Sequence, residues 1–337
     1  MTSRCSFRET GLLDNTRAVL AGDPKQLGPV VISKIAEEHG LGVSLLERLM
    51  RDNYLYKPDE DLGFDSQFIT KLLKNYRSDH GDLLSLSFIV LIFTFHSDFL
   101  RSHPSILKVP NDLFYNGELQ PCACPSQLYK QVELLPREGF PVVFHGVAGI
   151  SQQLIGFPSL YNRAEIQVIK DYLKSLIKHF HQKNVSHIQP GETGIISPYG
   201  KQVDKIQMAI QSDAELSKEN LENVEVGTVD KFHGKEFSVI LMSTGRTFPR
   251  LLHKPHFSLG FVKDERRFNV AMTRARYLLI VVGDPRLLVT EKSWNNHTGS
   301  RVRARAYSHT QVCSMTSPHN RKAHSSVVDL APPEHYE

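Results

Sequence analysis

The sequence predicts an α/β protein with a doubly wound parallel sheet. Two observations lead to this prediction: short apolar runs stop at turn residues, and stretches with apolar residues at helical spacing lie between them. Apolar runs of this kind are typical of parallel strands that are buried on both faces. Their alternation with helices favours a sheet with helices on both sides. Ligands of such sheets bind at the carboxyl ends of the strands.

Each expected element follows from its local pattern. The apolar run at 18–23 stops at Gly-Asp-Pro, which predicts a short buried strand. Residues 43–50 place apolar side chains at helical spacing, and residues 68–76 alternate as a strand does. Further buried strands are expected at 140–147, 193–199, 224–229, 238–244 and 277–284, and further helices at 164–181 and 267–276.

The composition is that of a globular protein that is neither disordered nor fibrous, with 40% hydrophobic and 23% charged residues. Because the formal charge is only +4, any nucleic-acid role must rest on a local basic face. The four cysteines lack zinc-like spacing, so no metal site is expected. No apolar leader is seen in 1–17, and the apolar run 83–95 is shorter than the roughly 17 to 25 residues that span a bilayer. No membrane role is therefore expected.

Two stretches carry side chains suited to a nucleotide. The loop 22–29 presents one neutral amide, Gln26, which can both donate and accept hydrogen bonds. Tyr76 stands beside Arg77, so that a ring able to stack on a base adjoins a guanidinium able to bind a phosphate. The alternative for this pair is an ordinary surface Tyr-Arg dipeptide.

Two later stretches have similar chemistry. In 226–236, Gly234 permits close backbone approach and Glu236 can accept hydrogen bonds from ribose hydroxyls. Arg267 and Arg274 are seven residues apart, which predicts one face of one helix and a fit to a polyphosphate. The alternative is a surface helix held by salt bridges.

The order and spacing of the motifs are more specific than any one of them. GDPKQLGPV, NYRS with HPSIL, GIISPYGKQV, VGTVDKFHGKE and RRFNVAMTRAR followed by LLIVVGDP resemble the C-terminal half of a superfamily 1 helicase of the up-frameshift-like group. SLLERL, NDLFYNGEL, GFPVVFHGV and SPYGKQVDKI resemble in particular the Moloney leukaemia virus 10-like RNA helicases, called Armitage in flies. The resemblance covers residues 18–294 except 79–102.

The resemblance implies a domain division and a nucleotide site. Residues 18–66 would be the end of a first RecA-like domain and 67–294 a second one, between a divergent start at 1–17 and a disordered tail at 295–337. Gln26 would face the γ-phosphate, Tyr76 would stack on adenine, and Glu236 with Gly234 would hold the ribose. Catalytic roles are implied for Gln26, Arg77, Arg274 as arginine finger, and Arg267 in support.

The resemblance also implies the partners. Residues at the positions that grip the RNA backbone are Ser197, Pro198, Tyr199, Gln202 and Thr228. The family couples hydrolysis of ATP, with Mg²⁺, to 5′-to-3′ movement on single-stranded RNA or RNA duplexes. It works with Argonaute-type silencing proteins, so a cytoplasmic location, including granules such as P-bodies, is expected.

Three departures from the family pattern bear on activity. His233 stands where glutamine is usual, and Gly200 stands where a basic residue is usual. No GxxxxGK[ST] occurs, and no Asp-Glu box precedes Ala18, so the Mg²⁺ ligands would lie in a missing N-terminal part. We therefore expect that this chain alone does not hydrolyse ATP. The alternative function is a catalytically inactive RNA- or protein-binding module that competes with the full helicase.

One segment interrupts the family pattern. Removing 79–102 restores the uninterrupted sequence KNYRSHPSIL. Arg-Ser stands just before this segment, at 77–78, and again at its end, at 101–102. We interpret 79–102 as an unspliced short intron translated in frame, or as a gene-model error. The alternatives are a true inserted hairpin and a membrane segment, although its apolar run is short for a bilayer.

Overall fold

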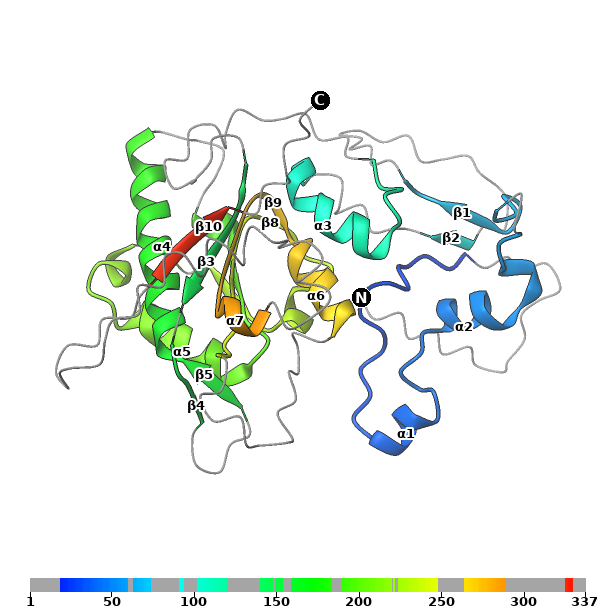
Figure 1. Ribbon diagram of the computed structural model, residues 1–337, viewed down its shortest axis with the longest axis horizontal. Helices are drawn as coiled ribbons and strands as arrows, with labels where there is room; N and C mark the ends of the chain where they lie inside the picture. Colours follow the sequence, from blue (N-terminus) through cyan, green and yellow to red (C-terminus); the bar gives the residue numbers. More distant parts are fainter. Residues whose placement is uncertain are drawn as a thin grey trace.

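A computed structural model describes the chain at 19–59, 63–73, 91–93, 102–120, 140–147, 149–153, 159–183, 190–219, 221, 224–247, 264–288 and 325–329. Its centre is a six-stranded sheet in the order β10-β3-β9-β8-β6-β7 (Figure 1). Five of these strands run parallel, and only β10 is antiparallel, to β3. The strands are β3 (Val142–Val147), β6 (Thr193–Ile196), β7 (Glu225–Gly227), β8 (Phe237–Ser243), β9 (Ala275–Gly283) and β10 (Ser325–Asp329).

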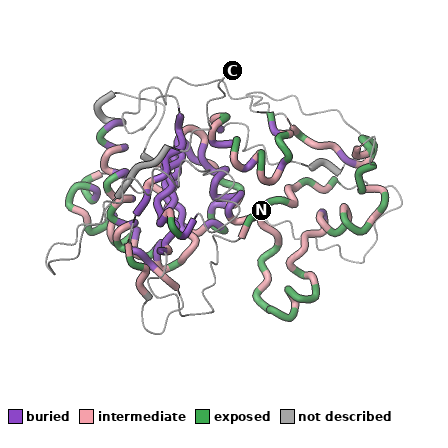
Figure 2. Tube along the Cα trace, viewed as in Figure 1, coloured by how far each residue is buried: buried purple, intermediate pink, exposed green. Residues whose placement is uncertain are grey.

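Helices cover both faces of the sheet, which confirms the predicted α/β class. α4 (Arg163–Lys183) and α5 (Gly200–Gln211) pack on one face, and α3 (Pro104–Phe114) and α6 (Glu265–Met272) on the other. Every residue of β8 is buried, as a central strand between two helical layers requires. Figure 2 shows the same burial as a purple centre between the two layers. Short elements complete this part: β4 (Ser151–Gln153), β5 (Leu160–Asn162), α7 (Pro285–Leu288) and the 3-10 turns Pro190–Glu192, Leu216–Lys218 and Val229–Phe232.

α6 is shorter than the helix predicted at 267–276. Asp264 caps its N-terminus by accepting hydrogen bonds from the backbone N–H groups of Arg266 and Arg267, and the helix ends at Met272. The next residues enter β9, because strand pairing in the centre of the sheet outweighs local helical periodicity. The prediction that Arg267 and Arg274 share a helical face is therefore wrong.

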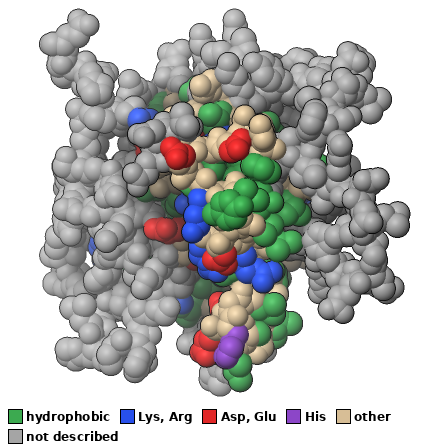
Figure 3. Space-filling model, turned by 90° about the vertical axis from the view of Figure 1, so that its right-hand side faces the viewer, with side chains coloured by type: hydrophobic (Ala, Val, Ile, Leu, Met, Phe, Trp, Pro, Cys, Tyr) green, Lys and Arg blue, Asp and Glu red, His purple; other side chains and the backbone are tan. Residues whose placement is uncertain are grey.

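The first described segment packs around a small apolar cluster of its own. It holds α1 (Lys34–Glu38), α2 (Leu45–Asp52), the 3-10 turn Tyr54–Tyr56 and β1 (Ile69–Lys71). Only Leu46 and Ile69 are buried in its cluster, whereas Val30, Ile32, Ile35 and Leu41 are exposed. Figure 3 shows the right-hand face, where apolar side chains lie at the surface beside charged ones.

The strand predicted at 18–23 is not formed in its described part. Residues 19–23 have no strand structure, and the side chain of Val19 is 53% exposed. A strand requires a neighbour for its hydrogen bonds, and none of the described strands pairs with these residues. The apolar run alone therefore did not decide the structure.

Two further predictions meet the structure in part. Ser325–Asp329 pairs with β3, so the predicted disorder of 295–337 is wrong for these five residues; the reason is that β3 offers an open edge. Leu91–Phe93 forms β2, parallel to β1. Residues 79–90 and 94–101 lie outside the described ranges, and the interpretations of the insertion remain predictions. Within those ranges no helix is long and apolar enough to cross a bilayer.

Candidate nucleotide and RNA site

The loop of Gln26 meets α6 through a chain of hydrogen bonds. Gln26 Nε2 donates to Asp23 Oδ2 over 2.9 Å, and the Tyr115 hydroxyl donates to the same oxygen over 2.7 Å. Asn269 Nδ2, on α6, donates to the Tyr115 hydroxyl over 2.7 Å and to the Lys25 carbonyl over 3.1 Å. Residues of the first and the last motif of the sequence are thus joined in one network of hydrogen bonds.

This chain of hydrogen bonds is buried. Gln26, Tyr115 and Asn269 are each at most 3% exposed. Burial, and then the negative charge of Asp23, raise the pKa of Tyr115 far above its ordinary value, so the hydroxyl keeps its proton. Gln26 Oε1 and Asn269 Oδ1 are buried with no hydrogen-bond partner in the described part of the chain. These two oxygens are acceptors that a bound ligand or its water could use.

A second contact joins α6 to α2. Arg266 Nη2 donates to Glu47 Oε1 over 2.7 Å. Gly28 allows this approach, because a Cβ there would lie 2.7 Å from the Gly42 carbonyl oxygen and 3.4 Å from Arg266 Nη1. The glycine of the loop is thus needed for packing against α2 and α6.

The two arginines predicted for catalysis have different surroundings. Arg267 is partly exposed and forms ion pairs with Asp264 at 3.3 Å and Asp230 at 3.5 Å. Arg274 is fully buried, and its Nη1 donates to the Lys235 carbonyl over 3.0 Å. Arg267 has the access that a phosphate contact needs, while Arg274 supports the backbone between the two predicted ribose-binding residues.

Those two residues lie near the amino end of β8. Gly234 has φ +77°, which only glycine adopts easily, and Glu236 Oε1 lies 3.8 Å from Arg276 Nη1. The Arg276 carbonyl accepts from the backbone N–H of His103 over 3.0 Å. The sequence that follows the insertion therefore contacts the start of β9, whose Arg276 side chain reaches Glu236. Tyr76 and Arg77 lie outside the described residues, so their predicted roles remain predictions.

The predicted RNA-binding residues gather at the carboxyl ends of β6 and β7. The register pairs Ile196 with Gly227, which brings the following residues, Ser197 and Thr228, side by side. Ser197 Oγ is buried and has no hydrogen-bond partner among the described residues. Pro198 and Thr228 are half-buried, so this edge offers both apolar and hydroxyl surface.

Next to this edge an aromatic ring and a guanidinium are stacked. Arg246 Cζ lies 4.9 Å from the centre of the Tyr199 ring, a cation–π distance. Gly245, with φ +70°, makes room for the ring, because a Cβ there would come within 2.8 Å of Tyr199 Cδ2. The stacked pair extends the polar edge from β6 to the end of β8.

Gln202 does not face this surface. It is fully buried, its Oε1 accepts from the Asn162 backbone N–H over 2.7 Å, and its Nε2 donates to Ser243 Oγ over 2.8 Å. A direct grip on RNA by Gln202 is therefore ruled out in this arrangement. The side chain instead holds the residues of this edge in place through its internal hydrogen bonds, since a buried amide must find its partners inside the protein.

Glu165 is the residue of this network that sequence reasoning missed. Its fully buried carboxylate accepts from the Gly245 N–H and Ser243 Oγ, both at 2.7 Å, and from Asn162 Nδ2 at 3.0 Å. Burial raises its pKa to about 7 despite these donors, with a smaller contribution from the charge of Asp284. An Asn-x-x-Glu at a helix start resembles ordinary helix capping, and only the partners about 80 residues away distinguish it.

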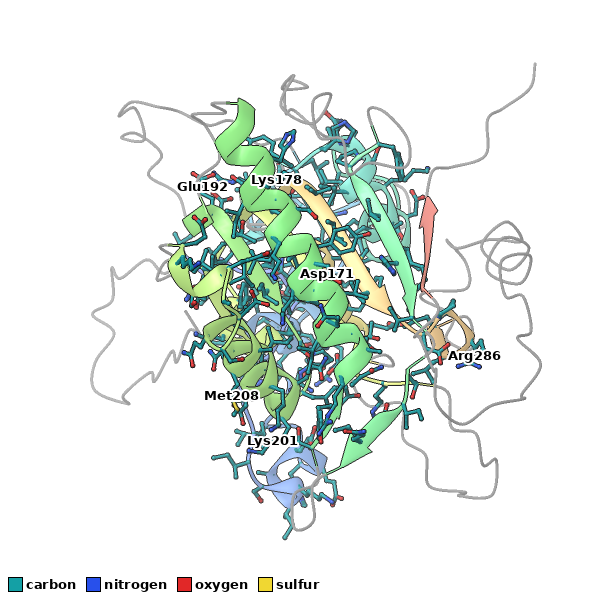
Figure 4. The ribbon with its side chains drawn as sticks, turned by 90° about the vertical axis from the view of Figure 1, so that its left-hand side faces the viewer. Asp171, Lys178, Glu192, Lys201, Met208 and Arg286 are labelled. Carbon is teal, nitrogen blue, oxygen red and sulfur yellow. The ribbon has the colours of Figure 1, made fainter. Side chains whose placement is uncertain are left out.

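The predicted ribose-binding residues and the predicted RNA-binding residues lie at opposite ends of the sheet. Arg276, which contacts Glu236, also lies 3.6 Å from Glu192, whereas Lys201 follows the Ser197–Tyr199 edge. Figure 4 shows Glu192 and Lys201 at opposite ends, with α4 running between them. No group of three or more His, Cys, Asp or Glu side chains within the described ranges is placed to hold a metal.

Comparison with known proteins decides the family. The family described as "AAA domain" matches residues 93–286. The chain belongs to this family. It is 45% identical to "Putative helicase mov-10-B.1" of Danio rerio over 89% of the chain, and 35% identical to "RNA helicase Mov10l1" of Mus musculus over 82%. It is 31% identical to "Probable RNA helicase armi" of Drosophila melanogaster over 87%.

These relatives confirm the resemblance to the Moloney leukaemia virus 10-like and Armitage-type helicases of the AAA domain family. The chain spans only 27%, 21% and 23% of their respective lengths. A solved C-terminal domain of a possible DNA helicase from a Lactobacillus is 13% identical, with a TM-score of 0.30 over 55% of this chain and 86% of that one. A likeness this weak supports no argument about function.

Proposed function

We propose that the chain forms the second motor domain of an ATP-dependent RNA helicase that moves 5′ to 3′. The single observation that supports this most is the buried contact between the loop of Gln26 and α6. A phosphoryl-transfer site needs polar groups fixed in place before the reaction, and this contact fixes them on two segments. The relatives' names, each of which includes the word helicase, also support the proposal.

The residues at this contact fit a polyphosphate in part. Gln26 and Asn269 each keep a buried acceptor oxygen available, and Arg267 supplies a partly exposed cation. ATP, when bound, supplies the phosphoryl group that is transferred to water. Gln26 would orient that water and Arg267 would attract the phosphates.

The carboxyl edge of the sheet fits a single strand of RNA. Thr228 supplies a hydroxyl group for the RNA backbone, and the Tyr199 ring supplies a stacking surface, whereas Ser197 is fully buried and lies behind them. Arg246, stacked on that ring, adds a positive charge for phosphate. Gln202 and Glu165 would act only by holding this edge in shape.

The wider setting belongs to the same proposal. The printed names of Mov10l1 and armi are those of RNA helicases, which supports action on RNA. The role in small-RNA-mediated silencing and mRNA regulation, with Argonaute-type partners, rests on the resemblance of the sequence motifs alone. We place the protein in the cytoplasm, including granules such as P-bodies. Co-precipitation of Argonaute-type proteins with the tagged chain, measured with and without ribonuclease treatment, tests this part.

The decisive test is RNA-stimulated ATP hydrolysis by the protein that the cell's complete transcript encodes, read across the start and the Arg77–Arg101 junction. We expect Arg267→Ala to lower the stimulated rate by at least roughly tenfold without changing RNA affinity, because a charge on the phosphates is lost. The matched control is Arg51→Ala, an exposed arginine that forms an ion pair with its neighbour Asp52.

Two results would contradict the helicase proposal. One is a wild-type protein that binds RNA but hydrolyses no ATP, which favours the inactive binding module that competes with a full helicase. The other is an Arg267→Ala rate equal to that of Arg51→Ala. RNA affinity from fluorescence anisotropy separates these outcomes from a simple loss of folding.

A further inference from the structure

Tyr115 joins three parts of the chain that are far apart in sequence. Its hydroxyl donates to Asp23, 92 residues away, and accepts from Asn269, 154 residues away. It stands at the C-terminal cap of α3. One hydroxyl therefore connects the loop of Gln26, α3 and α6.

The direction of these hydrogen bonds is fixed by chemistry. Asn269 Nδ2 can only donate, so the Tyr115 oxygen accepts from it and must use its own proton toward Asp23. Asp23 Oδ2 receives both this proton and the N–H of Gln26. The position of the Asp23 carboxylate, and through it the amide of Gln26, thus depends on the Tyr115 hydroxyl.

The ring of Tyr115 is held separately from its hydroxyl. It packs with Leu107 and Leu119, and against Phe114 at a centre-to-centre distance of 6.4 Å. A phenylalanine ring keeps this packing and loses the hydrogen bonds of the hydroxyl, among them those with Asp23 and Asn269. The fold can therefore survive the loss of the hydroxyl, and its positioning effect can be measured alone.

We propose that Tyr115 is a positioning residue that orients Gln26 toward the nucleotide by fixing Asp23 against α6. With Nε2 held by Asp23, Gln26 is left with Oε1 as its buried, unbonded acceptor in the described structure. That is the atom which can accept a proton of an attacking water. The inference rests on the proposed ATP-dependent function for its catalytic consequence, but not for its structural one.

The first arm of the test is amide hydrogen exchange in the 337-residue chain. We expect Tyr115→Phe to speed exchange at 23–28 by roughly tenfold, as loss of a hydrogen bond to a charged group predicts. The matched control is Tyr172→Phe, which removes another buried hydroxyl, the one hydrogen-bonded to His145 over 3.0 Å on the opposite face of the sheet. This control should leave exchange at 23–28 unchanged.

The second arm is steady-state hydrolysis by the transcript-encoded protein. Tyr115→Phe should lower kcat by roughly tenfold with KM for ATP unchanged, because orientation in the transition state is lost and ground-state binding is not. Unchanged exchange at 23–28, or equal exchange in both variants, would overturn the proposal. Faster exchange in Tyr115→Phe with no hydrolysis even in the wild type would instead contradict the ATPase function and leave the positioning intact.

Discussion

Glu165 shows how one buried carboxyl group links several segments of the RNA-binding edge. Its two oxygens receive hydrogen bonds from β8, from the loop that follows it, and from Asn162. The loop carries Arg246, which stacks on Tyr199. The protonation of Glu165 is therefore coupled to the shape of this surface.

The pH dependence of stability follows from the sign of the shift. The pKa of Glu165 is raised from 4.5 to about 7, so the folded protein binds more protons than the unfolded chain between these values. Its contribution to the free energy of unfolding then falls as pH rises from 4.5 to 7, by roughly 3 kcal/mol, and stays level above. Glu165→Gln should lose this slope.

Urea unfolding of wild type and Glu165→Gln at several pH values checks this. Burial lowers the pKa of His145, so its contribution is lost as pH falls and opposes that of Glu165. Because His145 is present in both proteins, it cancels in the difference between them. A difference in unfolding free energy that does not change between pH 5 and 7 would contradict the expected shift.

Individual site residues could be predicted from the sequence where a local motif contains them. Residues that act through partners far away along the chain could not. Gln26, Ser197 and Thr228 stand in loops after apolar runs, so their places at the site could be predicted. Tyr115 and Glu165 could not, since their partners lie about 80 residues or more away. No local pattern encodes such a distance. Gln202 was placed on the RNA because the motif gives order along the chain and not the direction of a side chain.

A single N-cap residue, Asp264, fixes where α6 begins. Asp264 accepts two backbone N–H groups of the first turn and also pairs with Arg267. Five residues of this helix are buried, so its start is tied to the core on that face of the sheet. The cap therefore matters to the whole domain and not to the helix alone.

Asp264→Ala should lower the free energy of unfolding by about 1 kcal/mol, the usual worth of an N-cap. Ser33→Ala, at the N-cap of α1, is the matched control. α1 has five residues and buries none of them, so its loss should barely change global unfolding. Equal losses measured by urea unfolding in the two variants would contradict this account.

The five parallel strands of the sheet could be predicted because buried parallel strands have a continuous apolar signal, whereas the antiparallel β10 could not. The end of α6 could not, since Arg274 and Arg276 continue a pattern that suits a helix and only the place of β9 beside β8 decides otherwise. The run at 18–23 failed for the opposite reason. Its composition suits a strand, but no described strand lies beside it.

For the whole molecule, the unequal size of the apolar clusters predicts unequal local stability. Two large clusters cover the two faces of the sheet, whereas Leu46 and Ile69 are the buried members, within the described residues, of the cluster beneath α2. The free energy of local opening depends on buried apolar contacts. The segment 19–59 should therefore open long before the sheet.

Native-state hydrogen exchange in low urea tests this difference. Amides of β8 and β9 should exchange only by global unfolding, and those of α2 by a local opening with little dependence on urea. Val239→Ala, in β8, should lower the protection of the β8 and β9 amides by about 1 to 3 kcal/mol through global destabilisation, and should leave the protection of the α2 amides unchanged. A common rate for α2 and β8 in wild type would show one cooperative unit instead.

The strand order also determines when, during synthesis, each strand can pair with its neighbours. β9 lies between β3 and β8, yet it is the last of the five parallel strands to be synthesised. The inner edges of β3 and β8 therefore wait without their partner until residue 283 has left the ribosome. At about 5–20 residues per second the interval between β3 and β9 is many seconds, and unpaired strand edges invite association with other chains. The centre of the sheet, most protected in the finished protein, is the part most in need of a chaperone while the protein is being made.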